Sequence, residues 1–273
     1  MPSHSNCFSV SFCKEIVRFE FAHSQNEKFL TLKCPPGIKT TRARWHFRVA
    51  TATPARKKYG PTLLRYDKRR STLSVRHGNL YFLTLNLKTR KGTVKVSKSP
   101  RIFFWLVKAV FYAIGLKKRC LFFHGATLAK NERCAYLFLG HSGMGKTTLC
   151  RHAKEKWHVF SDELGIIVPR KNEFYAHESP FFRPFTSRKG LSSASIQKIF
   201  ILSKGKKRNA WKTIGKERSL ERLMPYLFFP FNAPEFIPER LATLRALSQH
   251  LTIKDLRLFS FPNFLRALER GEP

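Results

Sequence analysis

The sequence predicts an α/β fold, and three observations carry this prediction. A short apolar run, a glycine-rich loop and a helical stretch follow one another over residues 134–157. Strand-like runs fill the chain before residue 100, and helical apolar spacing returns at 239–247. Elements mixed in this order are typical of domains that contain both sheets and helices. We expect a β-rich N-terminal subdomain over 1–100 and an α/β domain with a helical C-terminal tail over 101–273.

The first hundred residues contain the strand signals. Residues 80–87 and 92–96 form a hairpin-like pair across the turn at 88–91. The first dozen residues are expected to lack regular structure. The other strand-like runs are 16–21, 28–32 and 45–52.

Residues 102–116 predict a helix that packs within the protein. The run is apolar but shorter than the ~20 residues that a membrane span needs, and Lys108 lies near its centre. We expect it to lead into a strand at 121–128. Attachment to a membrane surface beside the basic residues 117–119 remains an alternative.

Residues 140–147 read Gly-His-Ser-Gly-Met-Gly-Lys-Thr, which completes the phosphate-loop pattern G-x-x-x-x-G-K-[ST]. Glycines let backbone amides turn toward phosphates, and the following helix adds the partial positive charge of its N-terminus. Lys146 can reach the β and γ oxygens, and Thr147 can hold Mg²⁺. The alternative is a fortuitous glycine-rich turn. The motif predicts ATP and Mg²⁺ as ligands, with nucleotide contacts from Gly140, Ser142, Gly143, Met144, Gly145, Lys146, Thr147 and Thr148.

Two acids follow the loop at short range. Asp162 lies 16 positions after Lys146, which leaves room for one helix and one strand. Because strand ends line the ligand crevice of a parallel sheet, Asp162 and Glu163 are expected to face the phosphates and share Mg²⁺ with Thr147. The alternative is a turn acid beside a solvated neighbour.

This region resembles the nucleotide site of the HPr kinase and phosphoenolpyruvate carboxykinase superfamily. The resemblance rests on Leu-Phe-Leu-Gly-His-Ser-Gly-Met-Gly-Lys-Thr-Thr-Leu at 137–149 and on Ser-Asp-Glu at 161–163. Leu-Phe-Phe-His-Gly-Ala-Thr-Leu at 121–128 favours the HPr kinase side, whose members carry a His-containing strand before the loop strand. The resemblance covers about residues 100–205. It implies a P-loop kinase core of HPr kinase/phosphoenolpyruvate carboxykinase type.

The resemblance also implies an activity and roles for single residues. It implies an HPr kinase-like phosphotransferase that moves the γ-phosphate of ATP to a hydroxyl of a protein, a peptide or a small molecule. Asp162 would be the catalytic base, His124 would lie beside the phosphates, and Glu163 stands where the family usually has a second Asp. From the residues alone, His124 is more simply a satisfied core histidine. The Glu-Ile-Arg-Gly string of members that also run the reverse reaction is absent, so phosphorylase activity is not implied.

The charge of the chain indicates an anionic environment or partner. Lys and Arg number 52 against 17 Asp and Glu, a formal net charge of +35. Nucleic acid, an acidic peptide and a membrane surface all fit this charge. The basic residues are scattered as well as clustered, and no recognised nucleic-acid module occurs. Non-specific polyanion binding is therefore expected.

The cysteines and the N-terminus bear on location. Six cysteines lack the C-x-x-C spacing of a zinc site and are expected to be free thiols in a reducing compartment. Cys134 and Cys150 flank the loop and are interpreted as packing residues. No signal-peptide pattern opens the chain. These features predict a cytoplasmic protein.

Two functions follow. The first is the ATP-dependent kinase, acting on a hydroxyl-bearing acceptor that is acidic if the basic charge serves recognition. The alternative is a basic ATP-binding switch protein that engages nucleic acid or another polyanion. Transfer of label from γ-³²P ATP to an organic acceptor, rather than to water, would distinguish them.

Overall fold

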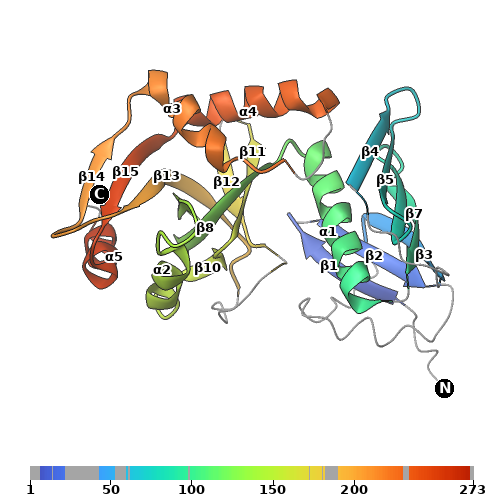
Figure 1. The fold of residues 1–273 in the computed structure, drawn as a ribbon, viewed down its shortest axis with the longest axis horizontal. Helices are drawn as coiled ribbons and strands as arrows, with labels where there is room; N and C mark the ends of the chain where they lie inside the picture. Colours follow the sequence, from blue (N-terminus) through green and yellow to red (C-terminus); the bar gives the residue numbers. More distant parts are fainter. Residues whose placement is uncertain are drawn as a thin grey trace. The chain divides into compact units, whose positions relative to one another are not determined.

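A computed structural model of the chain describes residues 7–13, 15–21, 43–52, 60, 62–97, 99–171, 173–179, 181, 190–229 and 234–270. The chain divides into two compact units, Met1–Lys118 with Phe229–Ile237, and Arg119–Phe228 with Pro238–Pro273. Both contain a sheet and helices, which confirms the mixed α/β class (Figure 1). The strand expected at 28–32 lies outside the described residues.

The first unit is built on a seven-stranded sheet in the order β1-β2-β3-β7-β6-β5-β4. The expected hairpin is confirmed, because β6 and β7 pair antiparallel, Leu83 opposite Val94. Strands β2, β3 and β7 run parallel to one another. The strands are β1 (Cys7–Phe12), β2 (Glu15–Phe21), β3 (Trp45–Ala52), β4 (Thr62–Asp67), β5 (Thr72–His77), β6 (Tyr81–Asn86) and β7 (Lys91–Ser97).

Helix α1 (Pro100–Lys117) covers one face of this sheet (Figure 1). Burial alternates along β2, because every second side chain points at the helix. The ring of Phe103 in α1 contacts those of Phe19 and Phe21, with centroids 5.9 and 5.5 Å away. The apolar run at 102–116 is thus a packed helix, as its sequence predicts.

The second unit contains an eight-stranded sheet in the order β10-β8-β11-β12-β13-β15-β14, with β9 beside β13 and β8. The loop strand and the strand predicted at 121–128 are both present. The strands are β8 (Leu121–Asn131), β9 (Cys134–Leu139), β10 (His158–Ser161), β11 (Leu164–Arg170), β12 (Glu173–His177), β13 (Ser193–Lys204), β14 (Ala210–Thr213) and β15 (Thr252–Leu258).

Helices cover both faces of the second sheet (Figure 1). Along β9, Leu137 and Leu139 pack in the core on the side of α3 and α4, whereas Tyr136 and Phe138 pack in the core on the side of α2 and α5. A strand buried on both faces reads as a continuous apolar run, as β9 does. The helical elements of this unit are α2 (Lys146–Ala153), α3 (Lys216–Leu223), η2 (Met224–Tyr226), α4 (Ile237–His250) and α5 (Phe261–Glu269), and η3 (Pro234–Phe236) belongs to the first unit.

The structure differs from the sequence expectations in three places. Strand β1 begins at Cys7, where regular structure was not expected, because it pairs with β2 along its whole length. Helix α2 ends at Ala153 rather than near residue 157. The sheet at the loop is mixed rather than parallel, because β9 runs parallel to β13 but antiparallel to β8. Helix α1 lies in the first compact unit, and the domain boundary at residue 100 stays a prediction.

Candidate functional site

The glycine-rich loop joins β9 to α2, as the motif requires. Gly143 and Gly145 have φ of +79° and +95°, a left-handed conformation that glycine adopts without strain. The amide of Leu149 donates to the carbonyl of Gly145 at 2.8 Å and so starts the helix directly after the loop. The N-terminus of α2, with its partial positive charge, therefore lies directly at the end of the loop.

Lys146 is buried at the base of this loop, with 7 % of its surface exposed. Its ammonium donates hydrogen bonds to the carbonyls of Gly140 and His141, the latter at 3.0 Å. Burial lowers the pKa of Lys146, and the charges of Glu163 and Asp162 oppose this shift. The Lys146 ammonium can replace one of these hydrogen bonds with a bond to a phosphate oxygen while its aliphatic side chain stays in place.

The acids lie in a turn between β10 and β11. The turn is fixed by Ser161, which belongs to the Ser-Asp-Glu string but has no role assigned from the sequence. The hydroxyl oxygen of Ser161 accepts hydrogen bonds from the amides of Glu163 and Leu164 at 3.1 and 2.8 Å. The amide of Gly125 in β8 donates to the carbonyl of Glu163 at 2.9 Å. Serine before two acids at a strand end is the available signal, since serine hydroxyls stabilise such turns.

The turn brings Asp162 to the loop. The Thr147 hydroxyl donates to Oδ2 of Asp162 at 3.2 Å. Because β9 and β10 are both antiparallel to β8, their carboxyl ends lie at one edge of the sheet, separated by one strand. A cavity of about 410 Å³ opens there, lined by His124, Ser142, Gly143, Gly145, Lys146, Thr147, Thr148, Asp162 and Glu163.

His124 lies at this cavity and not in the core. It is exposed on β8, opposite Leu164 of β11. The interpretation as a core histidine is therefore wrong. Desolvation by its surroundings lowers the pKa of His124, the charge of Lys146 lowers it further, and Glu163 opposes both.

Two predicted contact residues do not line the cavity. Gly140 contributes its carbonyl to Lys146, and a Cβ there would lie 3.2 Å from the Cβ atoms of Leu202 and Met144. Met144 packs against the apolar core beneath the loop. Their predicted contacts with nucleotide stay predictions. Both residues lie on the side of the loop that faces the apolar core.

A phenylalanine from the end of the chain supports the loop. The ring of Phe261, at the start of α5, stacks on His152 of α2 with centroids 5.7 Å apart. A Cβ added at Gly145 would lie 2.7 Å from Cζ of Phe261. No local sequence signal marks this residue, since only the pairing of α5 with α2 brings it to the loop.

The donor set of the cavity suits Mg²⁺. The described residues contain no group of three or more His, Cys, Asp and Glu side chains arranged to hold a metal. Thr147, Asp162 and Glu163 offer hard oxygen donors, and Mg²⁺ takes one or two carboxylates together with phosphate oxygens. Cys150 is a buried free thiol whose pKa burial raises, which agrees with a packing role.

The helices of the described residues give no candidate membrane span, since none combines the required length and hydropathy.

Comparisons with known proteins give limited support. The family described as SynChlorMet cassette protein ScmC matches residues 96–218, less than half of the 273 residues. No curated protein matches the sequence. A solved structure entitled "Structure of the Hpr(Ser) kinase/phosphatase from Coxiella burnetii" is similar to the chain with a TM-score of 0.34 and 10% identity, over 55% of this chain and 94% of that one.

Proposed function

We propose that the protein is an ATP-dependent phosphotransferase that moves the γ-phosphoryl group to a hydroxyl. The observation that carries the proposal is the meeting of a phosphate-loop threonine with a strand-end acid. Oγ1 of Thr147 and Oδ2 of Asp162 lie 3.2 Å apart in a cavity that the loop and Lys146 line. Phosphoryl transfer needs this set, because the enzyme must position the reactants, spread charge and accept one proton.

The chain's own residues divide these tasks. The loop amides and Lys146 would bind the β and γ phosphate oxygens. Thr147 with Asp162 or Glu163 would hold Mg²⁺, which supplies charge neutralisation at the phosphates when bound. Asp162 would accept the proton of the attacking hydroxyl. His124 would offer a ring nitrogen beside the phosphates.

The proposed core type is that of HPr kinase and phosphoenolpyruvate carboxykinase. The strand carrying His124, the loop and the acidic turn converge on one cavity, which supports the correspondence of the three sequence blocks.

The test is the fate of label from γ-³²P ATP with Mg²⁺. Free serine and serine-containing peptides serve as acceptors, and Lys146→Ala is the blank. We expect acid-stable label in the acceptor with wild type only. Label that appears only as inorganic phosphate, with turnover that rises when nucleic acid is added, would support the alternative ATP switch.

A further inference from the structure

The face of the first sheet that points away from α1 is polar and basic, and we call it the open face. Strand register places its side chains in rows across the sheet. One row consists of Glu20, Arg48, Thr93, Thr84, Ser74 and Arg65. The next consists of Lys95, Phe82, Arg76 and Leu63.

The open face carries positive charge that its own acids do not neutralise. Glu20 pairs with Arg18 at 3.1 Å, and Asp67 pairs with Arg70 at 3.7 Å. Among the described residues no ion pair reaches Arg48, Arg65, Arg76, Lys91 or Lys95. A ligand with negative charge therefore complements this face.

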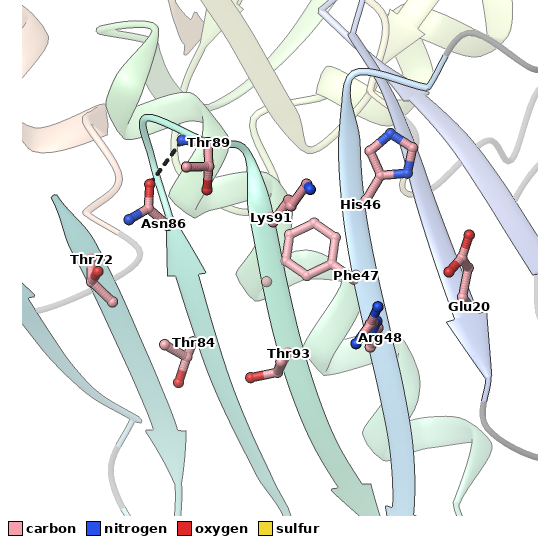
Figure 2. A pocket seen from close by; sticks show the side chains of 11 residues that line it. Glu20, His46, Phe47, Arg48, Thr72, Thr84, Asn86, Thr89, Lys91 and Thr93 are labelled. Carbon is pink, nitrogen blue, oxygen red and sulfur yellow. Dashed lines mark hydrogen bonds between the residues drawn. The ribbon is translucent and has the colours of Figure 1, made fainter. Parts of the chain in front are cut away.

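The face is also hollowed. A cavity of about 690 Å³ lies over β3, β7 and β6, and Figure 2 shows Arg48, Lys91, Thr84 and Thr93 around it. A smaller hollow of about 190 Å³ lies between Leu63 and Phe82, with Arg65, Ser74 and Arg76 completing its lining. Leu63 and Phe82 are 55% and 45% exposed. The basic hollow thus has an apolar neighbour.

The hydroxyls of the face favour a peptide over a nucleic acid. In the described part of the chain no hydrogen bond occupies the side chains of Ser74, Thr84 and Thr93. Hydroxyls both donate and accept, which matches the N–H and C=O groups of a peptide, whereas phosphates need donors only. Proteins bind single-stranded nucleic acid by stacking successive bases on several aromatic side chains. On the open face, the apolar neighbour of Phe82 is Leu63, which offers no aromatic ring.

We propose that the open face binds an extended acidic peptide segment that carries one large apolar side chain. The carboxylates would pair with Arg48, Lys91 and Lys95, and the apolar side chain would enter the hollow between Leu63 and Phe82. The strands from β3 to β4 cover about 19 Å at the usual spacing of ~4.8 Å, which is the length of about six extended residues. This inference does not depend on the phosphotransferase proposal.

The probe is a fluorescein-labelled peptide of about eight residues, in which glutamate alternates with serine around a central leucine. Fluorescence anisotropy without ATP, at about 0.15 M salt, measures its binding to the full chain. We expect it to bind at least about tenfold more tightly than the same peptide with glutamine for glutamate. Equal binding of the two peptides would overturn the proposal.

Matched variants locate the surface. Arg48→Gln with Lys95→Gln should weaken binding about tenfold, since each lost pair contributes modestly at an exposed site. Lys206→Gln with Lys207→Gln removes the same charge from an exposed turn after β13 and should change binding less than about twofold. Equal loss in both would mean non-specific attraction to the basic chain. Phe82→Ser should weaken binding about fivefold through lost apolar contact.

A single-stranded oligonucleotide of similar length decides the class of ligand. If it binds more tightly than the acidic peptide at the same salt, and the open-face variants weaken it equally, the peptide proposal is wrong. All substituted side chains are exposed, so unchanged thermal unfolding checks that the variants are folded.

Discussion

The two sheets of this protein differ in how many of their faces are covered. The second sheet is buried by helices on both faces. Its polar side chains gather at the strand ends, where Asp162 accepts a hydrogen bond from Thr147 of the loop. The first sheet has one face covered by α1 and one open. The strands carry this difference: β9 is continuously apolar, whereas β7 alternates, with Lys91, Thr93 and Lys95 on the open side. The closed sheet thus leaves its strand ends for the proposed phosphoryl transfer, and the half-open sheet leaves one face for the proposed peptide.

The largest effect is expected at the edge of the closed sheet. Asp162→Asn should lower phosphoryl transfer by about 10²–10⁴-fold while nucleotide still binds, because the amide keeps the shape but cannot take a proton. Asp67→Asn, the same change at the end of strand β4 in the half-open sheet, should leave transfer unaltered. Single-turnover transfer and binding of a fluorescent ATP analogue measure both. Near-normal transfer by Asp162→Asn would move the role to Glu163 or His124.

The next largest difference between the two sheets is expected in the free energy of unfolding that a lost phenylalanine side chain costs. Phe138 is fully buried and stacks on Phe200 with centroids 5.3 Å apart, so Phe138→Ala should cost about 3–5 kcal/mol in the free energy of unfolding. Phe82→Ala on the open face should change that free energy by less than about 0.5 kcal/mol. Urea unfolding measures the difference. Similar costs would mean that the open face is covered in solution.

Lys146→Ala tests whether the loop at the end of the closed sheet serves transfer rather than stability. We expect transfer to fall about 10²–10³-fold, as when one preorganised charge donor is removed. The fold should survive, because the Lys146 ammonium contacts loop carbonyls and not the apolar core. Circular dichroism together with ATP turnover tests this. Equal turnover in a folded variant would contradict the assignment of the phosphate loop.

The smallest effect concerns two glycines of the loop. Gly145→Ala should weaken ATP binding about tenfold, because the φ of +95° is strained for alanine and its Cβ would press on Phe261. Gly143→Ala has a φ of +79° and no atom within 4 Å of the added Cβ, so it reports the backbone strain alone. Titration calorimetry compares the two. Equal losses would show that the Phe261 contact has no influence on the loop.

Local chemistry made much of the structure predictable. The strand, glycine loop and helix at 134–153, the hairpin of β6 and β7 and the packed helix α1 depend on periodicity and turn residues that neighbouring positions supply. The sequence also predicted that Asp162 would lie near Thr147, because too few residues separate them for another element to intervene.

The antiparallel placement of β8 between β9 and β10 is non-local, and it turns His124 toward the cavity, although its apolar neighbours favoured a place in the core. Phe261 acts on the site through a helix pair that no short window reveals, whereas the turn at Ser161 is local and a serine before two acids is its signal. The sequence by itself determined the elements and the motif. Apart from the hairpin of β6 and β7, the tertiary structure alone decided which strands are neighbours, and therefore which faces are closed and which remain open for a partner, because pairing and burial depend on contacts between distant parts of the chain.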